Sequence, residues 1–248
     1  LVHGEQPVAP EAEEKYLNWI RQRAEHIPLQ QLTGEQGFMG LTFSVNEHVL
    51  IPRQDTEILV EEVLKELHDG MRVLDMCTGS GCILLSLLHY SNDCEGLGVD
   101  LSAEALEVAG RNVLKVLTPE KAEHAHFLQS DLFEKVEGKF EIIVSNPPYI
   151  ASAEVEKLMP EVRDHEPRMA LDGTEDGLYF YRRIIEEAGK HLVSSGMLFF
   201  EIGYDQGQAV SELMRTEGYC DVQVVQDYAG LDRVVFGTYV TVQPAPFA

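Results

Sequence analysis

The sequence predicts an α/β fold with a doubly wound, mostly parallel sheet. From residue 71 onward, short apolar segments with the character of strands alternate with segments with the character of helices. This alternation is typical of parallel strands joined by crossover helices. The apolar segments are continuous rather than alternately apolar and polar, which indicates strands covered on both faces. A glycine-rich turn follows the first of these strands, where sheets of this kind bind ligands.

A small helical and hairpin region precedes the sheet. Residues 11–26 predict a helix, with acidic side chains in the first turn and basic side chains later. Residues 38–45 predict strand material, which we expect to form a β-hairpin. Asp55 or Thr56 is expected to cap a helix over residues 56–68.

The elements of the sheet region follow in a regular order. Five apolar strands are predicted at residues 71–76, 96–100, 124–129, 140–145 and 196–202. Helices are predicted at residues 82–89, from Ser102 onward, at 176–193 and at 205–217. Two β-rich segments are predicted to close the chain, at residues 219–227 and 231–241.

Length, composition and charge narrow the classes of function. A chain of 248 residues, 44% of them apolar, can bury the core of one α/β domain. No apolar segment approaches the roughly 18 to 20 residues that span a bilayer, and no signal peptide is evident, so we expect a cytoplasmic protein without membrane attachment. The net charge of −23 repels phosphate backbones and disfavours direct binding of nucleic acid. The cysteines and histidines lack metal-binding spacing, so we expect no metal site.

The first predicted strand runs into the segment DMCTGSG, residues 75–81, at the start of the first predicted helix. Glycines there let the chain turn sharply and let a ligand approach the backbone. Asp100 ends the second strand, where its carboxylate can accept hydrogen bonds from both hydroxyls of a ribose. Together these features indicate a nucleoside-containing cofactor. Leu84 stands where a dinucleotide-binding pattern has its third glycine, which disfavours NAD.

A third feature follows the third predicted strand. Asp131 can accept a hydrogen bond from the amino group of an adenine, and Leu132 can flank the ring. By itself this segment is equally consistent with a helix cap.

The segment Asn146–Tyr149, NPPY, follows the fourth predicted strand at the carboxyl edge of the sheet. Its prolines lack N–H groups and leave carbonyl oxygens exposed to a ligand. The side-chain oxygen of Asn146 and the carbonyl of Pro147 can each accept one hydrogen of an –NH2 group, while Tyr149 can pack on a planar group. An amide nitrogen is a poor nucleophile, so the site must align it with a sulfonium methyl group and stabilise the charge that develops on it, without a dedicated general base. The sequence therefore predicts methyl transfer to a planar amide or amino nitrogen.

These motifs together resemble those of the HemK/PrmC family. Its members are protein-(glutamine-N5) methyltransferases that modify the glutamine of the GGQ motif in class 1 peptide chain release factors. The resemblance extends from about Ile27 to Phe236 and rests on segments such as VLIPRQDTEILVEEVL, VLDMCTGSGCI, IIVSNPPYI and EPRMALDGTEDG. It implies the Rossmann-like fold of class I methyltransferases, S-adenosyl-L-methionine as the methyl donor, S-adenosyl-L-homocysteine as its product, and a release factor as the protein partner. We expect a monomer.

The resemblance also implies roles for individual residues. The methionine part of the cofactor would contact Cys77, Thr78, Gly79, Ser80 and Gly81, its ribose Asp100, and its adenine Asp131 and Leu132. The glutamine would contact Asn146, Pro147, Pro148 and Tyr149, of which Asn146, Pro147 and Tyr149 would be catalytic and Asn146 would also touch the cofactor. The matching segment IPRQDTE places Arg53, as a substrate contact, and Glu57 in the wall of the active site.

The sequence departs from the family pattern at several points. Cys77 replaces a glycine and needs a backbone angle that other residues can adopt. Gln54 and Asp55 replace Pro and Glu, and Leu132 stands where some relatives carry Trp. We expect most of the family's helical N-terminal domain to be missing. We expect residues 1–30 to hold its remnant, residues 31–70 a hairpin and helix linker, and residues 71–248 the methyltransferase domain.

Two other functions remain open from the residues. An adenine-N6 or cytosine-N4 amino-methyltransferase would grip a flipped base in the same way. The net charge and the lack of room for a target-recognition domain disfavour it. A module that binds the cofactor without catalysis is disfavoured by the intact NPPY segment.

Overall fold

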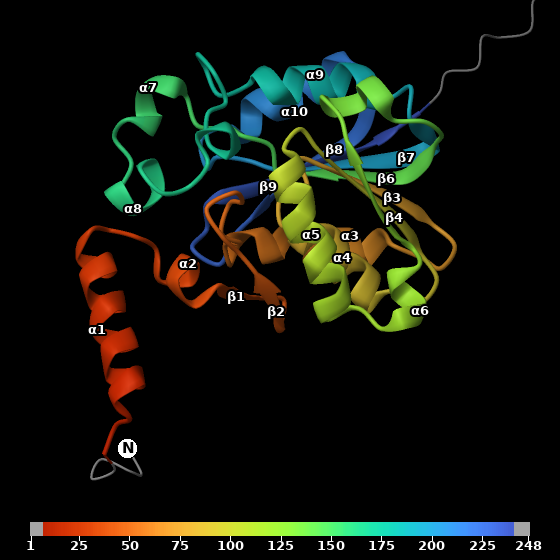
Figure 1. Ribbon diagram of the computed structural model, residues 1–248. Coiled ribbons are helices and arrows are strands. Elements are labelled where there is room, and N and C mark those ends of the chain that lie inside the picture. The colour runs from red at the N-terminus through yellow and green to blue at the C-terminus, as the bar shows by residue number, and fades with distance from the viewer. Residues whose placement is uncertain (1–6, 241–248) are drawn as a thin grey trace, which may run out of the picture.

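The computed structural model describes residues 7–240 and contains a seven-stranded central sheet (Figure 1). The strand order is β5-β4-β3-β6-β7-β9-β8. The strands are β3 (Arg72–Met76), β4 (Glu95–Asp100), β5 (Ala125–Gln129), β6 (Phe140–Ser145), β7 (Leu192–Glu201), β8 (Tyr219–Gln226) and β9 (Asp232–Tyr239). Among the seven strands of this sheet, β9 alone runs opposite to the other six. The carboxyl ends of β3, β4, β5, β6 and β7 therefore meet at one edge.

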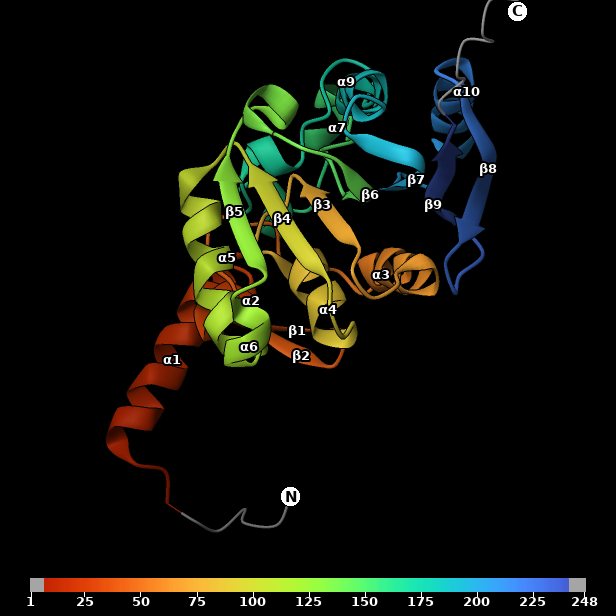
Figure 2. The same ribbon diagram turned by 90° about the vertical axis from the view of Figure 1, so that its right-hand side faces the viewer.

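Helices cover both faces of this sheet, as Figures 1 and 2 show. One face carries α3 (Asp55–Glu66), α4 (Cys82–Tyr90) and α5 (Ala103–Val116). The other face carries α9 (Tyr179–Ala188) and α10 (Gly207–Thr216). The shorter helices are α6 (Pro119–Ala122), η1 (Leu132–Lys135), α7 (Ser152–Val155), α8 (Pro160–Arg163) and η2 (Arg168–Ala170). The layered arrangement confirms the predicted doubly wound α/β fold.

An N-terminal segment lies beside the sheet. It contains α1 (Pro10–Ala24), α2 (Leu29–Thr33) and an antiparallel hairpin of β1 (Glu35–Phe38) and β2 (Leu41–Ser44). In both views α1 extends away from the rest of the molecule, and none of its described side chains is buried. The hairpin packs against α5 instead.

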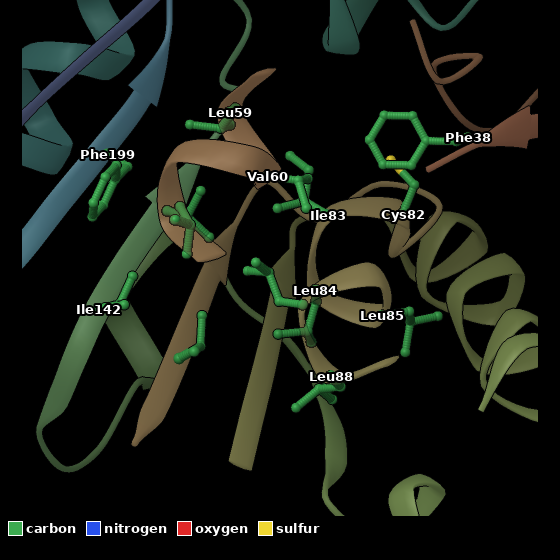
Figure 3. Close-up of a cluster of buried hydrophobic side chains, with 14 of the residues drawn as sticks. Phe38, Leu59, Val60, Cys82, Ile83, Leu84, Leu85, Leu88, Ile142 and Phe199 are labelled. Atoms are coloured by element: carbon green, nitrogen blue, oxygen red, sulfur yellow. The ribbon is translucent and has the colours of Figure 1, made fainter. Parts of the chain in front are cut away.

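The main apolar core explains why these segments are strands and helices. Seven consecutive residues of α4, from Cys82 to Leu88, are buried, as expected of a helix that is apolar all round. In Figure 3 the side chains of this helix lie among Leu59 and Val60 of α3, Ile142 and Phe199 of the sheet, and Phe38 of the hairpin. By contrast, α9 buries only the stripe Tyr181, Ile184, Ile185 and Ala188, which is the pattern of a helix with one solvated face.

The predicted elements are confirmed in order, and the differences lie at their ends. The helix expected over residues 176–193 is only α9, because Gly189 to His191 turn the chain into β7, which begins four residues earlier than predicted. The hairpin begins at Glu35 rather than at residue 38. Residues 1–6 of the first predicted domain, and residues 241–248, lie outside the described part of the chain.

The predicted cap of α3 was wrong. The N-cap residue is Gln54, and it makes no side-chain cap hydrogen bond. Asp55 instead pairs with Arg233 at 3.6 Å, and the Thr56 hydroxyl accepts a hydrogen bond from Asn146. Both side chains therefore face the carboxyl edge of the sheet rather than the backbone of their own helix.

Candidate functional site

A cavity of about 340 Å³ lies at the carboxyl edge of β3 to β6. Its first part, here called the β3–β5 half, is lined by turns after three strands, namely Cys77–Ser80, Asp100–Ser102 and Ser130–Leu132. Its second part, here called the β6 half, is lined by Asn146, Pro148, Arg53, Thr56, Pro167, Met169, Ala170 and Asp172. Its size is in the range of small-molecule sites, which is roughly 300–1,000 Å³.

The turn after β3 has a left-handed backbone at alternate residues. The φ angles are +62° at Cys77, +56° at Gly79 and +77° at Gly81. A Cβ atom added to Gly79 would meet no atom within 4 Å, so the backbone there is open to a ligand. Cys77 is one of the few non-glycine residues with a left-handed φ. It thus adopts the backbone angle that replacing the family's glycine requires. Burial raises the pKa of its thiol, so Cys77 lines the cavity in the neutral form.

Asp75 supports this turn from beneath. Its Oδ2 accepts hydrogen bonds from the Thr78 hydroxyl at 2.6 Å and from the Leu84 N–H at 3.3 Å. Burial raises the pKa of Asp75 to about 7. The side chain thus joins the turn to the first turn of α4, a role that the sequence motif did not show.

Asp100 binds the same turn from the neighbouring strand. Its Oδ2 accepts from the Gly79 N–H at 2.9 Å, and its Oδ1 accepts from the Ser102 N–H at 2.9 Å. A carboxylate has about four acceptor positions, so acceptor capacity is left for a ligand hydroxyl. Burial raises the pKa of Asp100 against these hydrogen bonds. The carboxylate is fixed in orientation and lines the cavity.

Asp131 and Leu132 also line the β3–β5 half. Arg183 of α9 donates to Asp131 Oδ1 at 2.9 Å and so holds the carboxylate from the far face of the sheet. Leu132 is buried and has a left-handed φ of +47°. Asp131 is the N-cap residue of η1 but makes no side-chain cap hydrogen bond, so its carboxylate does not serve as a cap.

The NPPY segment is divided between cavity and core. Asn146 and Pro148 line the cavity, whereas Pro147 and Tyr149 are absent from its described lining. The Tyr149 hydroxyl donates to Glu201 Oε1 at 3.3 Å, and its carbonyl accepts from Gln206 Nε2 at 3.0 Å. Burial and the Glu201 carboxylate raise the pKa of Tyr149, so the phenol stays protonated.

A loop from the opposite side fixes the backbone of this segment. Ile150 N–H donates to Leu171 O at 3.0 Å, and Gly173 N–H donates to Ile150 O at 2.8 Å. A Cβ atom on Gly177, whose φ is +72°, would lie 2.3 Å from the Tyr149 carbonyl oxygen. The GTEDG stretch therefore needs glycine at its end because it packs directly on the backbone of Tyr149.

Arg53 and Glu57, from the IPRQDTE segment, occupy different places. Arg53 lines the β6 half and pairs with the buried Glu166 at 2.5 Å. Glu166 also accepts from the Ile51 N–H at 3.2 Å, which ties the segment before α3 to the loop after α8. Glu57 is absent from the described lining and accepts from the Met39 N–H at 2.7 Å, so it holds the hairpin.

Several lining residues had no predicted role. They are His48, Val49, Leu50, Pro52, Thr56, Pro167, Met169, Ala170, Asp172 and Phe180. The available signals were the VLIPRQDTEILVEEVL and EPRMALDG segments, which entered the sequence analysis only through the family resemblance. No local pattern indicates that this segment and residues 48–56 meet across the cavity.

Two further properties concern the described residues. Between residues 7 and 240, no group of three or more His, Cys, Asp or Glu side chains gathers in a way suited to a metal ion. Within the same range, no helix has the length and apolar character needed to cross a membrane.

Comparison with known families gives two matches along the chain. Residues 53–162 match the model of the methyltransferase small domain, and residues 1–34 match that of the PrmC N-terminal domain. The first range contains the glycine-rich turn, Asp100, Asp131 and the NPPY segment. Most of the lining of the cavity thus lies within a methyltransferase match.

Comparison with individual proteins gives relatives over almost the whole chain. A release factor glutamine methyltransferase of Clostridium acetobutylicum is 42% identical over 95% of this chain and 83% of its own length. A release factor glutamine methyltransferase of Moorella thermoacetica is 45% identical over 94% of this chain and 82% of its own length. The fold is similar to that of a methyltransferase from Pyrococcus furiosus, with a TM-score of 0.59 at 18% identity, covering 89% of this chain and 98% of that one.

Proposed function

The chain belongs to the family of release factor glutamine methyltransferases, and we propose on this basis that it methylates the side-chain amide nitrogen, N5, of the GGQ glutamine in a class 1 peptide chain release factor. S-adenosyl-L-methionine is the methyl donor. The observation that supports the proposal most directly is that one cavity joins Asp100 and the glycine-rich turn to Asn146.

The residues of the β3–β5 half fit the methyl donor. Asp100 has free acceptor positions for ribose hydroxyls, and the open backbone at Gly79 leaves space for the methionine part. Asp131 keeps an oxygen that Arg183 does not occupy, and the buried Leu132 offers an apolar surface beside it, as an adenine ring requires. When bound, S-adenosyl-L-methionine supplies an electrophilic methyl group on a positively charged sulfur.

Asn146 of the β6 half and the adjoining Pro147, which is absent from the described lining, then hold the acceptor. We assign the Asn146 side-chain oxygen and the Pro147 carbonyl to the two amide hydrogens of the glutamine, which orients its nitrogen toward the methyl group. The same acceptors would stabilise the positive charge that develops on the nitrogen as the C–N bond forms and the C–S bond of the donor breaks. The nitrogen would then release one proton, and S-adenosyl-L-homocysteine would leave. Pro148 and Arg53 complete the wall around the amide. Tyr149 supports the segment from behind through Glu201.

Some expectations from the sequence stay predictions. These are the division of the chain at residues 30 and 70, the monomeric state, the cytoplasmic location, and the absence of a metal and of direct nucleic-acid binding. The relatives favour the protein substrate over the adenine or cytosine alternative.

Mass spectrometry tests the proposal. The chain is incubated with S-adenosyl-L-methionine and either a release factor or its GGQ→GGA variant, alongside a pool of DNA and RNA. We expect one added methyl group on the GGQ glutamine and none on the variant protein. Methylated adenine or cytosine without methylated protein would establish the alternative instead.

A further inference from the structure

The Asn146 amide has a partner that the sequence did not indicate. Its Nδ2 donates to the Thr56 hydroxyl oxygen at 3.5 Å, across 90 residues of sequence. Thr56 lies in the first turn of α3, is 2% exposed, and lines the cavity beside Arg53. A partner on Nδ2 leaves the other amide atom, Oδ1, to face a ligand.

Glu201 lies behind Thr56. Ser145 of β6 pairs with Phe200 of β7 in the parallel register, so Asn146 and Glu201 follow at neighbouring strand ends. The carboxylate is 2% exposed; Tyr149 donates to its Oε1, the nearby Thr56 hydroxyl lowers its pKa, and its buried Oε2 has no hydrogen-bond partner among the described residues. Burial raises the pKa of Glu201 overall, and Arg233 opposes that effect. A buried carboxylate makes a strong acceptor for the one hydrogen that Thr56 can donate.

The direction of these hydrogen bonds follows from the chemistry of the groups. A hydroxyl has one hydrogen and two acceptor positions. Asn146 Nδ2 lies 3.5 Å from the Thr56 oxygen, and the unpartnered Glu201 oxygen is the acceptor available for the Thr56 hydrogen. With its hydrogen directed to Glu201, the hydroxyl can only accept from Asn146. It therefore selects the amide orientation in which Nδ2 faces Thr56. The reversed orientation would place two oxygens together and would turn an N–H donor toward the hydrogens of the acceptor amide.

We propose that Thr56, backed by Glu201, is a positioning residue that fixes the Asn146 side-chain oxygen toward the acceptor nitrogen. The inference rests on the proposed function, because it concerns the same acceptor site. The surroundings keep Thr56 in place: Asp55 pairs with Arg233 at 3.6 Å, and Arg233 binds Asp227 at 3.0 Å. The start of α3 is thereby held against β9 and the turn before it.

The test compares Thr56→Val, Thr56→Ser and Asn146→Ala with the wild-type chain. Valine has the shape of threonine without the hydroxyl, and serine keeps the hydroxyl. Steady-state methylation of a release factor gives kcat and KM, and calorimetric titration gives the Kd for S-adenosyl-L-methionine. Thermal unfolding checks that each variant folds, and Thr56→Ala replaces Thr56→Val if the latter does not.

We expect Thr56→Val to lower kcat by about 10-fold to 100-fold, because a misplaced catalytic group slows transfer by about this much. The Kd and KM should stay within about 3-fold of the wild-type values. Thr56→Ser should recover most of the lost kcat. Parallel losses in stability, Kd and kcat, without recovery by serine, would show a purely structural role and overturn the inference.

The Asn146→Ala variant separates the two proposals. If it is inactive while Thr56→Val retains the wild-type kcat, the positioning role fails and the proposed function stands. If Asn146→Ala itself keeps wild-type activity, the acceptor role of Asn146 fails, and the inference fails with it.

Discussion

The two halves of the cavity are held together over different lengths of sequence. In the β3–β5 half, Asp75 binds Thr78 three residues away, and Asp100 binds Gly79 across 21 residues. In the β6 half, Asn146 binds Thr56 across 90 residues and Arg53 binds Glu166 across 113. The first half is built by neighbouring strand–turn–helix units. The second half exists only when distant segments have met.

This difference indicates which substitutions should impair donor binding and which should impair acceptor placement. Donor binding depends on turns of neighbouring units, with the longest of these contacts, from Arg183 to Asp131, spanning 52 residues. Acceptor placement depends on contacts that span 90 residues or more. We therefore expect substitutions in the β3–β5 half to change the affinity for the donor and substitutions in the β6 half to change transfer or stability. Four predictions test this separation.

The largest effect is expected for Asn146→Ala. Removing one acceptor of the developing charge should lower kcat by about 100-fold or more, the typical effect of deleting a transition-state hydrogen-bonding group. The Kd for S-adenosyl-L-methionine should change little, because the β3–β5 half stays intact. Rate measurements with calorimetric titration check this. An equal loss in rate and affinity would mean that the two halves are not separate.

The next effect concerns the β3–β5 half. Asp100→Ala should weaken binding of S-adenosyl-L-methionine by about 10-fold to 100-fold, since a hydrogen bond to a charged group contributes about 1.5–3 kcal/mol. Calorimetric titration measures the affinity, and Glu186→Ala, at an exposed position on α9, is the matched control. Unchanged affinity in Asp100→Ala would remove Asp100 from the donor site.

A stability effect is expected at Gly177. The methyl group of Gly177→Ala would collide with the Tyr149 carbonyl and should cost about 1–3 kcal/mol in the free energy of unfolding, as overpacking does. Gly218→Ala is the control, because Gly218 also has a positive φ, +89°, but no atom within 4 Å of an added Cβ. Denaturant unfolding of both variants separates backbone strain from the collision. Equal losses would show that the contact with Tyr149 is unimportant.

The smallest effect is a pH dependence at Asp75. Its folded-state pKa, about 7, lies above the ordinary value of 3.8, so the folded state binds the proton more tightly than the unfolded state. The stability from this group is present at pH below about 4 and is lost as the pH rises through 7. Between pH 5 and 8, the free energy of unfolding of Asp75→Asn should rise relative to that of the wild type by about 1 kcal/mol or more. Denaturant unfolding at several pH values measures this, and parallel curves would contradict it.

Most residues of the β3–β5 half were named from the sequence, although their binding of the cofactor stays a prediction. Gly81 is absent from the described lining, whereas Cys77, Asp100, Asp131 and Leu132 all line the cavity. They follow parallel strands, whose carboxyl ends necessarily share one edge. The sequence was less informative about the NPPY segment. It predicted that all four residues contact the glutamine, whereas Pro147 and Tyr149 are absent from the described lining of the cavity. Which side of a segment faces a cavity depends on what packs behind it.

The sequence by itself determined the order of strands and helices, the glycine-rich turn and the position of Asn146 at the sheet edge. Hydrophobic pattern and turn chemistry act over short stretches of chain and can therefore be read locally. Tertiary structure alone decided that Thr56 would face Asn146 instead of capping its helix, and that Glu166 would hold Arg53. Such pairs form because buried polar groups need partners, and only the packed fold brings distant partners within reach.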